Sequence, residues 1–264
     1  MFANLRNLFR YRGLIQALVA RDLKARYRGS VLGFFWSFVN PLLLLSIYSF
    51  VFAKILPNTI KETVPYEVFM FCGLLPWTWF SASLLEASGA LISGGNLIKK
   101  VLFPAEILPF VSVLSNMVHF FLGLLILAGF MIFRGHYPDW GELWWFPVIV
   151  LVQLVFTAAL SLILSALTVH FRDLRDLLAN LLTFWFFATP IIYYYQMPSV
   201  KDYGWLFDLN PFFHLAVSYQ EVLFFRGPFG HKWLLLLLGA ASVVLFLACY
   251  WVFDRLRDSF AEAV

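Results

Sequence analysis

The sequence has 264 residues, of which 62% are hydrophobic and 13% are charged. A soluble domain usually carries about 25% charged residues, so this composition excludes an ordinary soluble enzyme and predicts an all-α integral membrane protein. The net charge is +4, and seven of the 19 Lys and Arg residues fall within the first 28 positions, which favours an anionic membrane surface over nucleic acid as the partner of this segment.

The first predicted element is an amphipathic helix over residues 11–28, within a cytoplasmic N-terminal region of residues 1–33. Asp22 and Arg26 intrude on its apolar arc, but their i,i+4 spacing allows them to pair. Such a helix is expected to lie in the membrane interface with its apolar side down; an ordinary basic flank that sets topology is the alternative. The apolar face comprises Leu14, Ile15, Leu18 and Val19.

Six segments are long and apolar enough to cross a bilayer, which requires about 20 mostly apolar residues. Pro76 and Glu86 interrupt the second segment, and Pro190 is expected to kink or end the fifth. Thirteen Lys and Arg residues fall on the side that holds both termini and six on the other, so the positive-inside rule predicts cytoplasmic termini. The spans form one predicted domain over residues 34–264 and occupy residues 34–56, 66–92, 107–133, 144–169, 177–195 and 234–253.

The segment between the fifth and sixth spans, residues 197–232, is too apolar for a simple outer loop. Its apolar runs are too short to cross a bilayer, so they are expected to form re-entrant or interfacial helices. Breaks are expected at Asn210 and Pro211 and at Gly227 and Pro228. A loop that merely rests on the membrane surface is the alternative.

The sequence lacks the motifs of an ATPase or a zinc hydrolase. It contains neither G-x-x-x-x-G-K-[ST] nor H-E-x-x-H, so neither a metal nor another cofactor is expected in this chain. Most spans also lack the mid-membrane charge on which proton-coupled and ion-coupled transporters depend. Glu86 is the exception, and a salt bridge or a snorkelled position is favoured over a proton relay for it. Energy is therefore expected to come from a partner bound at the cytoplasmic loops.

Two strings of residues resemble a known family. Residues 96–109, NLIKKVLFPAEILP, resemble the first cytoplasmic loop of the polysaccharide and polyol-phosphate ABC exporter permeases. Residues 21–33, RDLKARYRGSVLG, run into Trp36 and Pro41 and are similar to the segment that leads into that family's first span. Further matches follow in the same order at residues 171–174, 189–193 and 210–212. The resemblance covers nearly the whole chain.

The chain departs from the family pattern in two places on the outer side. After Tyr193 the family commonly has a proline, but here the next proline is Pro198. Gln220 stands where the family often has an arginine. Both departures bear on the identity of the substrate and not on the class of transporter.

The family includes exporters of O-antigen, capsule and teichoic acid. The resemblance implies the permease subunit of an ABC transporter that exports an undecaprenyl-pyrophosphate-linked glycan, most of all O-antigen, across the bacterial inner membrane. It implies a homodimer bound to two copies of a separate ATPase, which would hold ATP and Mg. Capsule or teichoic acid export is the nearest alternative. A membrane-embedded polyprenol-lipid transferase and an ATPase-independent channel or secondary transporter are more remote ones.

The resemblance also implies where the ATPase binds. Residues 95–106 would form a coupling helix that docks on the ATPase, with apolar side chains as knobs and with Phe103 and Pro104 at its end; a basic loop that only sets topology is the alternative. A smaller second contact would come from Arg172 and Asp173. The coupling residues of the first loop are Asn96, Leu97, Ile98, Lys99, Lys100, Val101, Phe103 and Pro104.

Three further groups of residues follow from the implied channel. Aromatic side chains would contact the sugar rings, with lipid-facing or packing roles as the alternative; these are Phe34, Trp36, Trp185, Tyr193, Tyr194 and Tyr195. Basic residues would collect the lipid pyrophosphate, with general attraction to anionic lipid as the alternative; these are Arg21, Lys24, Arg26 and Arg28. An outer gate would comprise Trp205, Phe207, Phe212, Phe213, Phe224 and Phe225.

Overall fold

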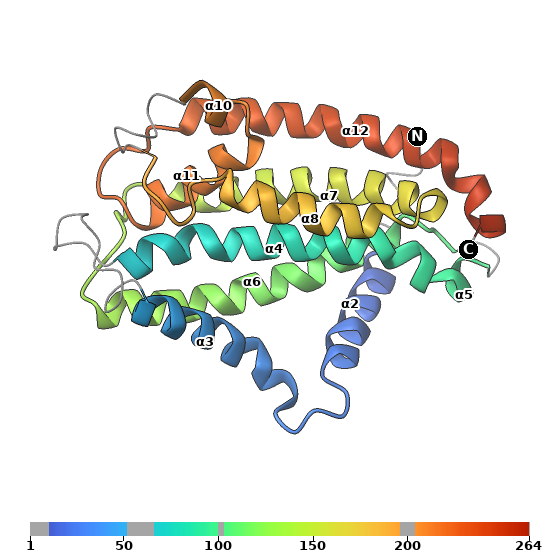
Figure 1. The fold of residues 1–264 in the computed structure, drawn as a ribbon, viewed down its shortest axis with the longest axis horizontal. Coiled ribbons are helices and arrows are strands. Elements are labelled where there is room, and N and C mark those ends of the chain that lie inside the picture. The colour runs from blue at the N-terminus through green and yellow to red at the C-terminus, as the bar shows by residue number, and fades with distance from the viewer. Residues whose placement is uncertain (1–10, 52–65, 100–102, 196–203, 264) are drawn as a thin grey trace.

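The computed structural model describes residues 11–51, 66–99, 103–195 and 204–263, and over these ranges every regular element is a helix. The helices are packed into an elongated bundle (Figure 1). In chain order they are α2 (Arg12–Arg26), α3 (Trp36–Phe50), α4 (Tyr66–Ser93), α5 (Gly95–Ile98), α6 (Ile107–Phe133), α7 (Phe146–His170), α8 (Leu174–Phe187), α10 (Gly204–Asp208), α11 (Pro211–Leu223) and α12 (Lys232–Ala263). Two 3₁₀ turns, η1 (Gly33–Phe35) and η3 (Leu143–Trp145), precede α3 and α7. The predicted all-α fold is confirmed for the described residues.

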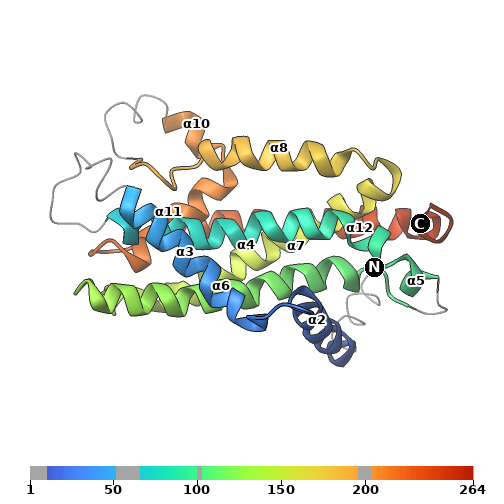
Figure 2. The same cartoon turned by 60° about the horizontal axis from the view of Figure 1, so that its bottom comes forward.

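Within the described residues, four helices are long and apolar enough to cross a membrane: α4, α6, α7 with the preceding η3, and α12. α4 is the central helix and packs against both α6 and α7, while α12 packs along α7 (Figures 1 and 2). In the most apolar stretch of each helix, 78% of the residues of α4 are buried inside the protein but only 22% of those of α12. α12 therefore presents most of its apolar surface outward.

The second, third and fourth predicted spans coincide with α4, α6 and α7 to within two residues at each end. The sixth predicted span lies inside α12, which continues ten residues further, to Ala263. The first predicted span, residues 34–56, begins two residues before α3, a helix of 15 residues. Its predicted end falls in residues 52–65, outside the described ranges.

The bounds predicted for the fifth span, residues 177–195, are wrong. α8 begins three residues earlier and ends at Phe187, so it has 14 residues and a length of about 21 Å, less than the roughly 30 Å of a hydrocarbon core. Pro190 explains the end of the helix, because proline lacks the backbone N–H and disfavours a helical conformation of the residue before it.

The segments that the charge distribution places on one side lie at one end of the bundle. α2, α5, the turn between α7 and α8, and the C-terminal part of α12 are all at that end (right in Figure 1), whereas α10 and α11 lie at the opposite end. This grouping agrees with the predicted topology. The assignment of the α5 end to the cytoplasm stays a prediction.

α2 covers the start of α6 with its apolar face. Leu18 is buried against Ile107 and Val111, and it is flanked by Leu14, Ile15 and Val19. The predicted amphipathic helix is therefore confirmed, with bounds of Arg12–Arg26. This side packs at least in part on α6, and the placement of α2 in the membrane interface stays a prediction.

α4 is joined to α6 by polar contacts near both of its ends. Glu67 is buried near the start of α4 and forms an ion pair with Arg134, the residue that follows α6. Near the other end, Oε2 of Glu86 accepts a 2.7 Å hydrogen bond from Nδ2 of Asn116 on α6. A buried charge is costly unless it is paired, so the ion pair with Arg134 offsets the burial of Glu67, whereas Glu86 is 38% exposed.

α11 begins at the predicted break. Oδ1 of Asn210 accepts a 3.0 Å hydrogen bond from the backbone N–H of Phe212, and Pro211 occupies the first helical position, as is typical of a helix N-terminus. Eleven of the 13 residues of α11 are buried, and the helix packs against α4, α7 and α12. α11 is thus part of the protein interior, which excludes the surface-resting loop for this segment; its re-entrant placement in a membrane stays a prediction.

Candidate functional site

A polar cluster joins α2, α4 and α6 near the α5 end of the bundle. Arg26 forms ion pairs with Asp22, at 3.0 Å, and with Glu86. Its Nη1 donates a 3.1 Å hydrogen bond to Oδ1 of Asn116, whose Nδ2 in turn donates to Glu86. The predicted pairing of Asp22 with Arg26 is confirmed, and so is the salt bridge favoured for Glu86.

The cluster holds Arg26 in its charged form. Burial lowers the pKa of Arg26, but the carboxylates of Glu86 and Asp22 raise it by more, so the net shift is upward. Each of the three guanidinium nitrogens already donates a hydrogen bond within the cluster. Four of the five N–H donors of Arg26 are therefore engaged within the protein, and its role as a lipid head-group ligand stays a prediction.

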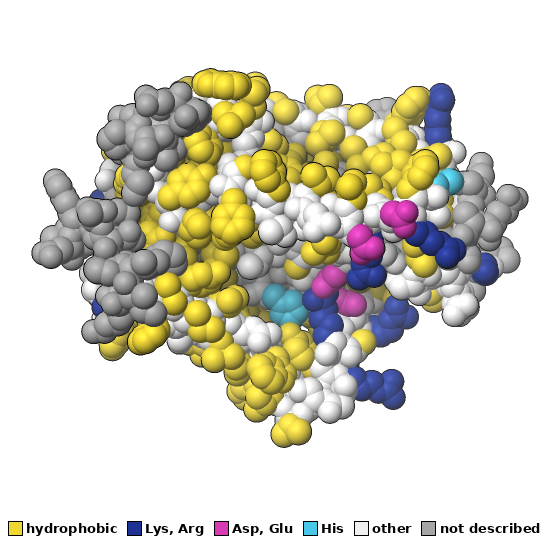
Figure 3. Space-filling model, viewed as in Figure 1, with side chains coloured by type: hydrophobic (Ala, Val, Ile, Leu, Met, Phe, Trp, Pro, Cys, Tyr) yellow, Lys and Arg dark blue, Asp and Glu magenta, His cyan; other side chains and the backbone are white. Residues whose placement is uncertain are grey.

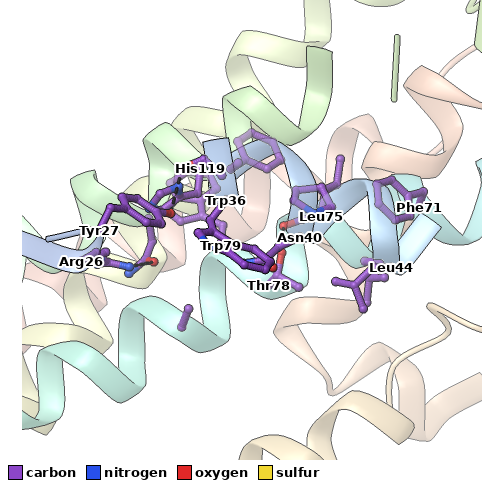
Figure 4. Close-up of a pocket in the computed structure, with 16 residues that line it drawn as sticks. Arg26, Tyr27, Trp36, Asn40, Leu44, Phe71, Leu75, Thr78, Trp79 and His119 are labelled. Carbon is purple, nitrogen blue, oxygen red and sulfur yellow. Dashed lines mark hydrogen bonds between the residues drawn. The ribbon is translucent and has the colours of Figure 1, made fainter. Parts of the chain in front are cut away.

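A cavity of about 250 Å³ lies beside this cluster, between α3, α4 and α6 (Figure 4). Its wall is polar and aromatic where Arg26, Tyr27 and Trp36 line it, and apolar towards Leu44. The rings of Tyr27 and His119 meet edge to face with centroids 6.0 Å apart. Polar groups beside aromatic faces are suited to amphipathic molecules such as sugars.

The predicted channel residues lie in two separate regions. Trp36 lines the cavity of Figure 4, and its Nε1 donates a 3.0 Å hydrogen bond to Oγ of Ser30. The side chain of Phe34 lies outside the described residues. Trp185 packs edge to face on Phe80, with ring centroids 5.3 Å apart, and also lines an apolar groove beside α8, so its channel role stays a prediction.

The three predicted channel tyrosines follow α8 at the opposite end of the bundle. The hydroxyl of Tyr193 donates a 3.0 Å hydrogen bond to the carbonyl of Phe187, at the end of α8. Tyr194 and Tyr195 stack on one another with ring centroids 6.2 Å apart. All three are half-buried, so they form an aromatic surface there and do not meet Trp36.

The predicted coupling helix over residues 95–106 is shorter than expected. α5 is a single turn that ends at Ile98, and Phe103 and Pro104 lie in an irregular segment just before the turn into α6. Lys100 and Val101 lie outside the described residues. The helix predicted to run to Phe103 is therefore too long: it ends at Ile98, and Lys99 already lies outside it.

The apolar side chains of this segment do not project as free knobs. Leu97, Ile98 and Phe103 are half-buried in a cluster that includes Leu91 and Leu108 of the same chain. This packing leaves only part of each side chain exposed, and their role as knobs for an ATPase stays a prediction.

Exposed polar side chains remain at the same end of the bundle. Asn96 and Lys99 are exposed on and next to α5, and Pro104 is buried. Arg172 and Asp173 are exposed at the turn between α7 and α8. These four exposed residues are the part of the predicted coupling surface that a partner protein could contact.

The predicted gate residues range from the core to the surface. Phe212 is fully buried, with its ring centroid 4.9 Å from that of Trp77 and 4.8 Å from that of Phe80. Phe213 and Phe224 are also buried, whereas Phe207 and Phe225 are half-buried and Trp205 is 67% exposed. A gate has to move, so the structure assigns Phe212 to packing and leaves Trp205 as the most accessible member.

Charged side chains gather on one part of the surface. Figure 3 shows Lys, Arg, Asp and Glu over α2 and the neighbouring ends of α4 and α8, whereas hydrophobic side chains cover the opposite part of this face. Arg21, Lys24 and Arg28 are exposed. The three remaining predicted head-group residues are thus accessible from outside the protein.

Several contacts of the structure were not predicted. Asn210 is a hydrogen-bonding centre between α8 and α11; an asparagine directly before a proline that starts a helix signals an N-cap, but nothing in the sequence points to its bond with Trp185. Glu106 is buried, with Arg257 of α12 at 3.8 Å. That contact joins positions far apart in the chain, so no local pattern reveals it.

These features define a multi-pass membrane protein. Four long apolar helices form the body of the bundle, and the described residues hold no group of three or more His, Cys, Asp and Glu side chains that could bind a metal. The charged residues are concentrated at one end, where exposed polar side chains are available to a partner.

Comparison with known proteins gives the family. Residues 13–224 match the family model of the ABC-2 type transporter. The chain is 41% identical over the full length of both proteins to the O-antigen export system permease protein RfbA of Myxococcus xanthus. It is 32% identical to RfbA of Klebsiella pneumoniae over 94% of each chain, and 22% identical to the polysialic acid transport protein KpsM of Escherichia coli over 79% of this chain and 80% of that one.

The chain belongs to the ABC-2 type transporter family. It is a membrane permease of that family, as the resemblance to ABC exporter permeases predicted. Membership implies a partner ATPase in an ABC transporter.

Proposed function

We propose that this chain is the permease subunit of an ABC exporter that moves a lipid-linked polysaccharide, of the O-antigen type, across the bacterial inner membrane. The observation that carries the proposal is the 41% identity over the whole chain to a protein named as an O-antigen export permease. Capsule export is the second candidate, favoured by the 22% identity to a polysialic acid transport protein. Teichoic acid export and a polyprenol-lipid transferase have no comparable support.

In the proposed complex, two copies of the chain bind two copies of a separate ATPase, which holds ATP and Mg. Exposed Asn96, Lys99, Arg172 and Asp173 at one end of the bundle support an ATPase contact there. The outward-facing apolar residues of α12 support contact with lipid or with the second copy. The termini are cytoplasmic in this arrangement, because α2 and the end of α12 lie at the ATPase end.

The ATPase contact is tested by charge reversal. Lys99→Glu combined with Arg172→Glu should reduce co-purification of the co-expressed ATPase at least tenfold, because both side chains are exposed at the proposed contact. Lys232→Glu, at the exposed start of α12 and the opposite end of the bundle, serves as the matched control and should leave co-purification unchanged. Full retention of the ATPase by the double variant would argue against this contact surface.

The export activity is tested with the purified complex in liposomes. A glycan on a polyprenyl pyrophosphate should become accessible to a glycosidase on the far side only when ATP and Mg are supplied on the ATPase side. Transfer of the glycan to another acceptor without ATP would instead support the transferase. O-antigen and capsular glycans offered in parallel separate the two export candidates.

A further inference from the structure

A second groove, of about 600 Å³, lies at the α5 end of the bundle among α2, α4, α5, α6 and α8. This volume is in the range of ligand-binding pockets, about 300–1,000 Å³. Three arginines from two separate elements line it: Arg21 and Arg26 from α2, and Arg175 from α8. Convergence of cations from distant parts of the chain is a feature of anion sites.

The three arginines are not equivalent. Arg26 is neutralised within the groove, because Asp22 and Glu86 both pair with it. Among the residues that the structure describes, the guanidinium groups of Arg21 and Arg175 have no hydrogen-bond or ion-pair partner. The remaining acidic side chains of the groove are thus already occupied, and two uncompensated cations face the space.

The fold places Arg175 over the central helix. Nη1 of Arg175 lies 3.7 Å from the position that a Cβ of Gly89 would take. Gly89 is a glycine of α4 that lies one turn beyond Glu86 and also lines the groove. The guanidinium of Arg175, an exposed residue, therefore lies beside Gly89 of α4 at the rim of the groove.

A separate, apolar groove of about 610 Å³ begins one turn beyond Arg175 along α8. Leu178 and Leu182 line it on α8, and it extends to Tyr193, Phe207 and Asn210. Leu178 lies three residues after Arg175, and residues at i and i+3 share one face of a helix. The same face of α8 thus carries a cation at one end and an apolar groove along the rest.

We propose that this face of α8 binds a lipid phosphate, with the phosphate between Arg21 and Arg175 and the hydrocarbon chain along Leu178 and Leu182. The occupant is chosen by chemistry: two uncompensated cations match an anionic head group, and the adjoining apolar groove matches its tail. The proposal rests on the proposed function in one respect, because a polyprenyl phosphate head group is the part of such a substrate that it would recognise. Of the four predicted head-group residues it keeps Arg21, and it replaces Lys24, Arg26 and Arg28 by Arg175.

The test measures binding of a polyprenyl phosphate to the purified chain in detergent, for example by native mass spectrometry. Arg175→Gln and Arg21→Gln should each weaken binding about tenfold, the effect of losing one charge-assisted hydrogen bond. Arg175→Lys should restore part of the affinity, because it keeps the charge and loses the planar fork. Lys24→Gln and Arg28→Gln, which remove equal charges from outside the groove, should change it less than twofold.

Three results would overturn the proposal. Equal losses in Arg28→Gln and Arg175→Gln would mean general attraction to the basic surface. Equal affinity for the polyprenol without phosphate would mean that the cations take no part. Binding of inorganic pyrophosphate as tight as that of the lipid would mean a site for a free anion without a tail groove. A thermal unfolding temperature equal to that of the parent chain confirms that Arg175→Gln is folded.

The same experiment separates this proposal from the proposed function. Binding that depends on Arg175 in a chain that exports no glycan with its ATPase would leave the lipid site standing and remove the export activity. ATP-driven export that is unaffected by Arg175→Gln and Arg21→Gln would leave the exporter standing and remove the site.

Discussion

The indole Nε1 of Trp185 donates a 2.7 Å hydrogen bond to Oδ1 of Asn210, 25 positions further along the chain. Asn210 also caps α11 through the N–H of Phe212 and donates from Nδ2 to the carbonyl of Ala188 and to Oγ1 of Thr189. Every donor and the acceptor of this amide are therefore used. Asn210 fastens the end of α8 to the start of α11.

Asn210→Ala should destabilise the protein by about 3 kcal/mol, since several hydrogen bonds of about 1 kcal/mol each are lost. Asn210→Asp should also destabilise the protein, because the carboxylate still accepts from Trp185 and Phe212 but sets an anionic oxygen against the carbonyl of Ala188 in place of the donor. Asn180→Ala, on the exposed side of α8, is the control and should stay within about 0.5 kcal/mol of the parent. Unfolding in detergent measures all three; equal stability of Asn210→Ala and the parent chain contradicts the role of Asn210.

Arg26 and Glu86 should be energetically coupled across the α2–α4 contact. In a double-mutant cycle of Arg26→Ala and Glu86→Ala, the coupling energy is expected to be about 1–2 kcal/mol. This is below the cost of breaking a fully buried pair, about 3–5 kcal/mol, because the two side chains are 24% and 38% exposed.

The matched control for this cycle pairs Glu86→Ala with Arg28→Ala. Arg28 is exposed and lies two residues beyond Arg26. These two changes should add to within about 0.5 kcal/mol. Additivity of the Arg26 and Glu86 changes, measured by the same unfolding experiment, would show that the ion pair contributes nothing to stability.

Two glycines of α6 should respond differently to the same substitution. A Cβ on Gly123 would lie 2.6 Å from Cδ2 of Leu75, whereas a Cβ on Gly129 meets nothing within 4 Å. Both changes to alanine gain about 1 kcal/mol of helix propensity, but Gly123→Ala also overpacks the α4–α6 contact, at a cost of about 1–3 kcal/mol. Gly123→Ala should therefore unfold at the lower temperature of the two. Identical unfolding temperatures would mean that Leu75 moves aside without cost.

Alanine substitutions of Phe212 and Trp205 should distinguish a side chain that packs in the core from one that lies on the surface. Phe212→Ala opens a cavity beside Trp77 and Phe80 and is expected to cost about 3–5 kcal/mol. Trp205→Ala removes a side chain that is 67% exposed and should change the free energy of unfolding by less than about 0.5 kcal/mol. If both variants are as stable as the parent chain but lose export, Phe212 belongs to a gate after all.

The elements that could be predicted from the sequence are those whose ends coincide with polar residues or with a proline. The bounds of α4 and α6 follow from apolar runs that end at polar residues, and the pairing of Asp22 with Arg26 follows from their spacing alone. The start of α11 follows from Asn210 and Pro211. In each case the deciding contact lies within a few residues of the signal.

The packing partners of the helices could not be predicted in the same way. In a chain that is 62% hydrophobic, helices are apolar on most faces, so periodicity does not separate a face that meets protein from one that meets lipid. The most apolar stretch of α12 is more hydrophobic than that of α4, yet it is far less buried. For the same reason Leu97 and Phe212 were predicted to serve a partner or a gate, although both pack on their own chain.

The two ties between α4 and α6 limit how these helices can move. Glu67 and Glu86 are 19 positions apart, which is about 28 Å along a helix, and each is fastened to α6 or to the residue that follows it. Sliding one helix past the other by a single turn would separate both carboxylates from their partners at once. A conformational change during transport is therefore expected at other helix–helix contacts, with α4 and α6 moving together as one rigid body.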